Sequence, residues 1–386
     1  MTLSGLLDFA GANVGGTQNI AKGSTVSTNI GTSATSVIRI DAVEDLGGGM
    51  KASVRYALDP RTFANDNLVV TNNTGASGAS TTAAAPAYTA GATGSLANTT
   101  TGMARDEAYI SLSGGFGDVK LGSPNSIGLT SFLGASPLGT GVGSGYGLAG
   151  TFSNIRYNRS VRYDTPDMAG FSASVLYAPG NDQATVAPLL LTSGSSTALT
   201  IPNARKTTEI GLRYANGPLT VSYVNISQAA QTNKTGWYSG AYSNAAAPAD
   251  EPAKTSANII NASYNFGSTT LYAGWNDGDR LAPVFATDGA AVKSKGYRVA
   301  IKQNIGAIDL MAQYTEQKSL TPIAQAANAG EVTAKVTGLR ADYNLSKTAA
   351  VYVGYESWDT GAAYTTTFAS ASGKRNITSL GLRKSF

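Results

Sequence analysis

The residues of this chain that could do chemistry are its charged side chains, because its 386 residues include no cysteine and no histidine. A chain without histidine lacks the usual general base and the commonest metal ligand. A chain without cysteine has no disulfide, no thiolate metal site and no thiol nucleophile. An enzyme would have to work through carboxylates or a Ser–Lys pair. We therefore expect no enzymatic activity, no metal and no cofactor, and a role for fixed charges that attract or repel solutes.

Basic residues gather in one part of the sequence. Residues 119–163 contain no aspartate or glutamate, but they include Lys120, Arg156, Arg159 and Arg162. Arginine stays charged and binds carboxylate or phosphate groups with a planar fork of donors. The whole chain carries 28 Lys and Arg against 24 Asp and Glu, a balance too mild to predict a nucleic-acid partner. The basic stretch instead indicates a region of positive potential.

The elements that position these charges are predicted to be β-strands. In VIRIDAVEDL, Ile38 and Ile40 lie on one face of a strand, and Arg39 and Asp41 lie on the other. An alternation of this kind is typical of a strand with one apolar face. Similar runs recur along the chain, whereas no window approaches the ~18 consecutive apolar residues of a membrane helix. The pattern predicts an all-β fold.

Short turns and long loops alternate between these strands. Seven tight turns rich in Gly, Asn or Pro are expected near residues 47–49, 114–117, 166–170, 216–218, 266–268, 305–307 and 345–347. Eight longer polar segments are expected at roughly 10–34, 59–103, 124–155, 179–203, 230–253, 278–292, 318–330 and 358–373. Outer-membrane barrels place short turns on one side and long loops on the other, and a large barrel leaves an aqueous channel. We therefore predict that residues 1–386 form one domain, a 16-stranded antiparallel transmembrane β-barrel with both termini on the short-turn side.

Strand parity then divides the charged residues between the lipid side and the lumen, because lipid-facing and lumen-facing positions alternate. The lumen-facing set contains basic residues for an anion path and acids that would partly offset them. The basic residues are Arg39, Arg55, Arg105, Lys120 and Arg162, and the acids are Asp41, Glu107 and Asp164. Four basic residues on later strands also have lumen parity: Arg213, Arg298, Lys302 and Arg340. The sequence does not place these later strands relative to loop 124–155.

Four motifs are similar to one known family. VEDLGGGMKASVRYALD, AYISLSGGFGDVKLG, SVRYDTPDMAGFSASVLYA and the closing LGLRKSF resemble the Gram-negative trimeric porins, particularly those of beta-proteobacteria. The resemblance implies a homotrimer in the bacterial outer membrane, in contact with its lipid and lipopolysaccharide. It also implies that the third long loop, residues 124–155, folds inside the barrel and narrows the channel. Arg156 stands where relatives have a constriction arginine, whereas Val37 and Ser123 stand where relatives have arginine.

The second and third long loops carry different expectations. By the same resemblance, the low-complexity residues 59–103 latch onto a neighbouring subunit, or else they are mobile. The tip of loop 124–155 is neutral and rich in glycine, so it does little to oppose the positive potential of the basic wall. The function expected is passive diffusion of small hydrophilic solutes with a preference for anions.

Three alternatives remain open. In a weakly selective general porin, the acids Asp41, Glu107 and Asp164 would neutralise the arginines. In a channel for a specific organic acid, the lumen would recognise one solute. A more remote alternative is a plugged surface barrel that acts as an adhesin.

The last residue, Phe386, is predicted to close the barrel. SLGLRKSF has the pattern of a final strand that pairs with TLSGLLDFA, with Leu380 and Leu382 toward lipid. Phe386 would then lie at the periplasmic membrane interface, where a terminal Phe resembles the assembly signal of outer-membrane proteins. Because the start of the chain has no basic region followed by an apolar core, we expect a mature form whose signal peptide is absent.

Overall fold

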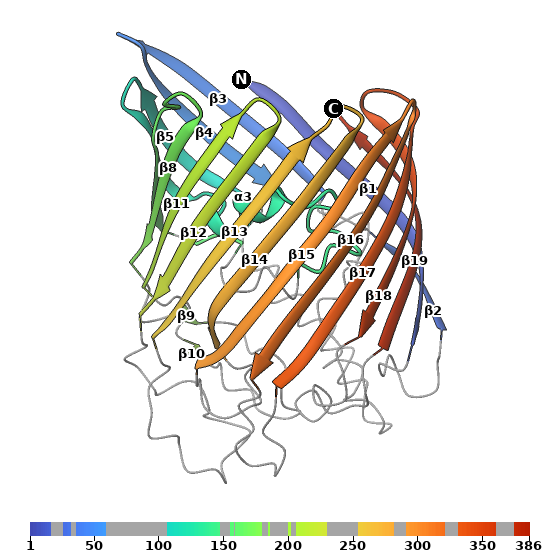
Figure 1. Ribbon diagram of the computed structural model, residues 1–386. Helices are drawn as coiled ribbons and strands as arrows, with labels where there is room; N and C mark the ends of the chain where they lie inside the picture. The colour runs from blue at the N-terminus through green and yellow to red at the C-terminus, as the bar shows by residue number, and fades with distance from the viewer. Residues whose placement is uncertain are drawn as a thin grey trace.

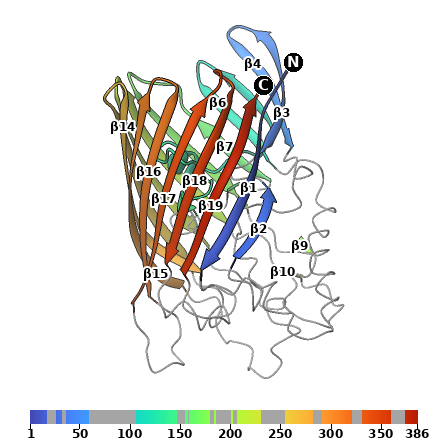
Figure 2. The ribbon, with the colours of Figure 1, turned by 90° about the vertical axis from the view of Figure 1, so that its right-hand side faces the viewer.

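A computed structural model of the protein describes residues 1–16, 26–31, 36–58, 106–146, 155–157, 159–179, 184–185, 200–201, 206–229, 254–281, 291–320, 331–359 and 374–386. These residues form a ring of long tilted strands, and both chain termini lie at the same end of it (Figures 1 and 2). In the described part of the chain, no helix has the length and apolar character needed to cross a membrane.

The first part of the chain supplies one described helix and strands of 5 to 15 residues. They are β1 (Thr2–Gly16), β2 (Val26–Gly31), β3 (Val37–Gly47), β4 (Met50–Leu58), β5 (Ala108–Gly114), β6 (Gly117–Ser123), α3 (Ile127–Leu133), β7 (Ser160–Asp164) and β8 (Phe171–Ala178). The second part supplies mostly longer strands. They are β11 (Thr207–Asn216), β12 (Leu219–Gln228), β13 (Thr255–Asn265), β14 (Thr269–Leu281), β15 (Ala291–Ile305), β16 (Ile308–Leu320), β17 (Glu331–Asn344), β18 (Ala349–Asp359) and β19 (Lys374–Ser385). A separate two-stranded sheet joins β9 (Ala184–Thr185) to β10 (Thr200–Ile201).

The described strands close into a 16-stranded antiparallel barrel, as predicted. The main sheet has seventeen strands by number, but β2 and β3 pair end to end along the single strand β1 and occupy one position in the ring. Consecutive strands pair with each other, β8 pairs with β11, and β19 returns to pair with β1. A closed ring leaves no unpaired sheet edge, as the predicted membrane location requires, because an unpaired backbone group would be costly in lipid.

All seven tight turns lie where the sequence predicts them, but several strands extend into segments that were expected to be loops. In the turn after β3, the three glycines 47–49 have φ angles of 80°, 60° and 80°, which residues with a side chain rarely adopt. The expectation of a loop over residues 10–34 is wrong for residues 10–16 and 26–31, which pair with each other. Strand pairing is made by backbone hydrogen bonds, so Gly, Asn and Thr can extend a strand without an apolar pattern.

The two faces of the strands follow the predicted alternation. On β11, Ile210 and Leu212 are 45% and 54% exposed on the outer face, whereas the intervening inward-facing Gly211 and the preceding Glu209 are buried. On β19, Leu380 and Leu382 are likewise exposed on the outer face. Charged side chains on the inner face therefore reach the lumen side of the wall.

The seam between the two ends of the chain has the predicted pairing. The backbone N–H of Phe386 donates to the carbonyl oxygen of Gly5 at 3.1 Å, and the N–H of Gly5 donates back to the carbonyl of Phe386 at 2.9 Å. The Phe386 ring lies over Gly5, where a Cβ atom would meet the ring at 2.6 Å. The last residue is therefore part of the closed barrel, although its ring stays about half exposed.

Candidate functional site: the inner wall and the segment bound to it

The segment that follows β6 is attached to the inner face of the barrel at the start of α3. Its helix begins after Ser126, whose hydroxyl oxygen accepts a hydrogen bond from the N–H of Leu129. One carboxylate oxygen of Glu209, on β11, accepts hydrogen bonds from the N–H groups of Ile127 at 2.7 Å and Gly128 at 3.1 Å. Since these N–H groups have no partner inside the helix, the strand supplies the acceptor that the helix lacks.

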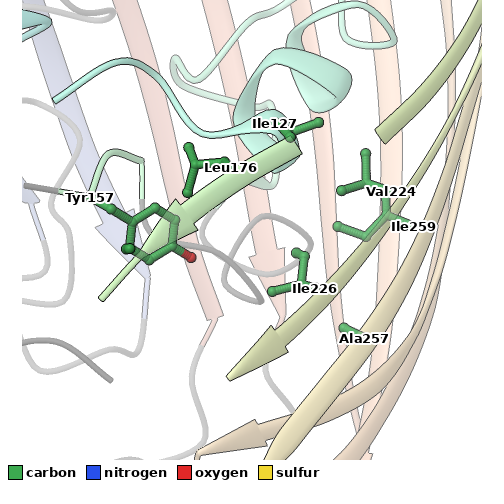
Figure 3. Close-up of a cluster of buried hydrophobic side chains, with 8 residues drawn as sticks. Ile127, Tyr157, Leu176, Val224, Ile226, Ala257 and Ile259 are labelled. Atoms are coloured by element: carbon green, nitrogen blue, oxygen red, sulfur yellow. The ribbon is translucent and has the colours of Figure 1, made fainter. Parts of the chain in front are cut away.

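An apolar cluster reinforces this attachment. Ile127 and Tyr157 pack against side chains that point inward from β8, β12 and β13, and Figure 3 shows the cluster beside the start of α3. The wall residues are Leu176, Ala178, Val224, Ile226, Ala257 and Ile259. Burial of an aliphatic side chain contributes ~1.5–3 kcal/mol, so the cluster holds the segment firmly.

The chain beyond α3 is held by β15. Arg298 donates from Nε to the carbonyl oxygen of Ala135 at 3.1 Å, and from Nη2 to Oδ1 of Asn261 at 2.9 Å. Its guanidinium lies 3.9 Å from the ring centre of Phe132, and the residue is only 2% exposed. Arg298 therefore binds the segment around α3, and this segment covers the guanidinium charge.

The segment is held further around the ring by β16, β17 and β18. Gln313 accepts a hydrogen bond from the hydroxyl of Ser136 at 2.9 Å, and Glu356 accepts one from the N–H of Gly143 at 2.7 Å. Gly143 lies so close to Gly338 on β17 that a Cβ atom at position 338 would meet its carbonyl oxygen at 2.2 Å. We call the inward-facing residues Glu209, Asn261, Arg298, Gln313, Gly338 and Glu356 the loop-binding wall.

The attached segment itself is electrically neutral. Residues 124–146 include no Asp, Glu, Lys or Arg. Burial raises the pKa of Tyr146 to about 12, so its hydroxyl keeps its proton at neutral pH. The potential near the segment is therefore set by the barrel wall.

A second group of side chains, from β3 to β7, carries charges that pair with one another. Arg55 lies between two carboxylates, with Nε 2.7 Å from Asp41 and Nη1 3.0 Å from Glu107. Its guanidinium is also 5.9 Å from the ring centre of Tyr109. The other oxygen of Glu107 accepts a hydrogen bond from the N–H of Asn125 at 3.1 Å.

A carboxylate on β7 joins two more of the predicted basic residues. Asp164 lies 2.5 Å from Nζ of Lys120 and 2.8 Å from Nη2 of Arg162. It also accepts a hydrogen bond from the hydroxyl of Ser174. Lys120 has a second acid, Asp118, at 3.0 Å. Both positive charges are therefore matched by nearby negative ones.

The remaining predicted residues have different surroundings. Arg156 donates from Nη1 to Asp106 at 2.7 Å and to Oδ1 of Asn125 at 3.0 Å. Arg159 is exposed, with a positive φ of 58°. The Nε atom of Arg39 is buried without a hydrogen-bond partner among the described residues. We call these charges the charged wall: Arg39, Asp41, Arg55, Asp106, Glu107, Asp118, Lys120, Arg156, Arg162 and Asp164.

Several predicted features lie outside the described residues. They are Arg105, loop 59–103, and the part of loop 124–155 that covers residues 147–154. Sequence reasoning also missed two acids of the charged wall, Asp106 and Asp118. Asp106 has the same parity as the outward-facing Ile110 and Leu112, so parity assigned it to the lipid side. Asp118 lies at the turn end of β6 with the same parity as Lys120 and could have been found.

The later basic residues of lumen parity divide into bound and unbound ones. Lys302 pairs with Asp309 at 3.1 Å, and Arg340 pairs with Asp342 at 2.6 Å. Arg213 on β11 is exposed, and no described residue forms an ion pair or hydrogen bond with it. It lines a cavity of about 160 Å³ beside α3, a placement that strand parity alone did not predict.

Comparisons with known proteins agree with this architecture. The family described as "Gram-negative porin" matches residues 1–363. Outer membrane porin protein 32 of Delftia acidovorans is 27% identical over 366 residues, which cover 91% of this chain and 82% of that protein. Major outer membrane protein P.IB of Neisseria gonorrhoeae is 31% identical over 136 residues, which cover 35% of this chain and 34% of that protein. The match to the gonococcal protein thus spans about a third of its length.

Solved structures share the fold along the whole chain. The anion-selective porin from Comamonas acidovorans has a TM-score of 0.66 at 20% identity, with 100% of this chain and 99% of that chain covered. OmpT of Vibrio cholerae has a TM-score of 0.61 at 12% identity, with coverage of 100% and 97%. At these identities the likeness shows the fold alone. The family match covers nearly the whole closed barrel, and the chain therefore belongs to the Gram-negative porins, a family of non-enzymatic outer-membrane channels.

Proposed function

We propose that this protein is a diffusion channel for small hydrophilic solutes, in which the segment after β6 narrows the pore and the charged wall gives a mild preference for anions. The observation that carries the proposal is the attachment of residues 126–143 to inward-facing side chains from β11 to β18. A segment bound to the inner face on that side leaves the passage between itself and the charged wall.

The sign of the selectivity follows from the charges on the two sides of this passage. The bound segment is neutral over residues 124–146, so it offers no acids to attract cations. Arg39 has no described carboxylate at salt-bridge distance, Arg159 is exposed, and the other basic residues keep their charge beside acids. Charges that line a narrow low-dielectric passage act on ions that pass close to them. The charged wall holds five basic and five acidic residues, so the proposed preference for anions rests on Arg39, which has no such described partner, and on the exposed Arg159 outside that wall.

The pairing within the charged wall limits the size of that preference. Arg55, Lys120, Arg156 and Arg162 each lie within 3.0 Å of a carboxylate. An ion pair leaves a dipole whose field falls off faster than that of a single charge. These pairs favour the second candidate, a weakly selective general porin.

Reversal potential in a planar lipid bilayer separates the two candidates. With a tenfold KCl gradient across the membrane, an anion-preferring channel gives a reversal potential of the sign expected for chloride. A value near zero would favour the weakly selective porin, and a cation-preferring value would refute the proposal. Absence of conductance steps would instead favour a plugged barrel.

We further propose the homotrimer that the family resemblance implies. The outer face of β3 to β8 carries exposed apolar side chains such as Ile40, Val54, Ile110 and Leu121, which suit contact with either lipid or a second copy of the barrel. Multi-angle light scattering of the detergent-solubilised protein tests this, because a trimer has three times the protein mass of the 39.4 kDa chain.

A further inference from the structure

A cavity with polar and apolar lining residues lies between α3 and the inner wall formed by β8, β11 and β12. Its volume is about 160 Å³. Two arginines, Arg162 and Arg213, contribute to its lining, together with hydroxyl-bearing residues that include Ser172, Thr220 and Ser222. None of the described residues that line it is an aspartate or glutamate. The cavity is therefore a positively charged space with hydrogen-bond donors, of a size suited to a small solute.

The two arginines contribute to this space in different ways. Arg162 uses Nε and Nη2 on Asp164 and Nη1 on the carbonyl oxygen of Asn125. Arg213 is exposed on β11 and has no ion pair or hydrogen bond with any described residue. Its fork of donors is thus available to a ligand, whereas Arg162 supplies mainly charge that Asp164 already offsets.

The hydroxyl groups also divide into engaged and available ones. Ser222 shares a hydrogen bond with Ser131, which accepts another from Asn261 at 2.7 Å. Ser172 and Thr220 have no described side-chain partner. Ser172 is opposite Arg213 in the β8–β11 register. Thr220 shares the inner face of β12 with Ser222, which is opposite Arg213 in the β11–β12 register. A ligand bound to Arg213 would therefore have hydroxyl donors nearby.

We propose that this cavity is a transient binding site for small oxyanions, in which the guanidinium of Arg213 holds a carboxylate or phosphate group. The proposal rests on the anion-preferring function proposed above and identifies the class of anion. A planar guanidinium matches two oxygens of such a group, whereas chloride offers it only one centre. The site is open and has one free arginine, so binding is weak enough for the solute to leave, as conduction requires.

Blocking of the open-channel current tests the site directly. Succinate or inorganic phosphate is added to single wild-type channels in KCl, and the concentration that halves the current is measured. We expect Arg213→Gln to raise this concentration at least about fivefold, because a charge-assisted hydrogen bond is lost. Arg213→Lys keeps the charge but loses the fork, so it should retain the chloride preference and weaken the block. Lys295→Gln, which removes the same charge from the exposed outer face of β15, is the matched control and should behave like wild type.

The outcomes separate this site from the proposed function. If Arg213→Gln is blocked as readily as wild type by both anions, the site is refuted even when wild type prefers anions. If wild type prefers cations in KCl but Arg213→Gln still weakens the block, the general anion preference is refuted and the site stands. Weakening for phosphate alone or for succinate alone identifies which oxyanion the site accepts, and weakening for both shows that it accepts either group.

Discussion

The charged wall and the loop-binding wall use the same kinds of side chain for opposite purposes. On the charged wall, Arg55 pairs with Asp41 and Glu107, and its side chain remains 32% exposed. On the loop-binding wall, Glu209 and Arg298 bind backbone groups of the segment around α3 and are almost completely buried. In the proposed channel the first group faces the passage, whereas the second group is covered by the segment around α3.

The difference shows that lumen parity alone does not place a charge in the path of a solute. Arg213 and Arg298 both point inward, on β11 and β15. Arg298 is covered by Phe132 and bonded to Ala135, so a passing ion does not meet it. Arg213 lines an open cavity. The two arginines differ because the segment around α3, which is distant from both in the sequence, covers Arg298 and leaves Arg213 exposed.

The largest effect is expected at the seam on which both walls depend. Deletion of Phe386 removes two backbone hydrogen bonds with Gly5 and the ring that covers it. We expect a strong drop in the amount of folded barrel recovered from outer membranes. The folded fraction is measured by heat-modifiable electrophoretic mobility, which compares boiled with unboiled samples. Barrels that do fold should conduct as wild type does. Phe386→Tyr is the control, and normal assembly of the deletion variant would contradict a role of this residue in closure.

The next largest effect is expected where the loop-binding wall holds α3. Glu209→Ala leaves the N–H groups of Ile127 and Gly128 without their acceptor. A hydrogen bond to a charged group contributes ~1.5–3 kcal/mol, so we expect a loss of about 2–4 kcal/mol and a noisier open-channel current. Thermal unfolding in detergent and single-channel recording measure the two effects. Glu44→Ala, at an exposed position, is the matched control. If Glu209→Ala has the current noise and the stability of wild type, then other contacts hold the segment in place.

A smaller effect is expected from a steric change on the same wall. Gly338→Ala would place a Cβ atom 2.2 Å from the carbonyl oxygen of Gly143, so the segment has to shift. Overpacking of this kind costs ~1–3 kcal/mol, and the conductance should change because the width of the passage changes. Gly11→Ala on β1 is the control, because no atom lies within 4 Å of its added Cβ. An unaltered conductance of Gly338→Ala would show that this contact does not set the width.

The smallest effect is expected from a single member of the charged wall. Arg156→Ala removes one positive charge and leaves Asp106 without that partner. We expect the anion-to-cation permeability ratio to fall by about twofold or less, because the remaining charges persist and salt screens each of them. Reversal potentials at low and high KCl measure the change, which should be larger at low salt. An unchanged ratio at low salt would remove Arg156 from the ion path.

Most of the fold could be predicted from local patterns. Alternation placed Ile210 and Leu212 on the outer face, and glycine-rich turns marked the short connections. The apolar cluster under α3 also left a signal, because Leu176 and Val224 are apolar at positions whose parity points inward. A strand that is apolar on both faces indicates that its inner face is covered. The extension of β1 to Gly16 left no such signal, since backbone pairing does not depend on side-chain polarity.

The sequence by itself determined the strand number, the faces of the strands, the seam at Phe386 and the concentration of basic residues near residue 156. Only the tertiary structure decided which of those charges are paired, covered or open. The pairs join distant residues: Arg156 meets Asp106 across 50 positions, and Glu356 meets Gly143 across 213. A charge acts over a few ångströms that only the folded barrel sets, so the electrostatics of the channel belong to the fold and not to any single stretch of the chain.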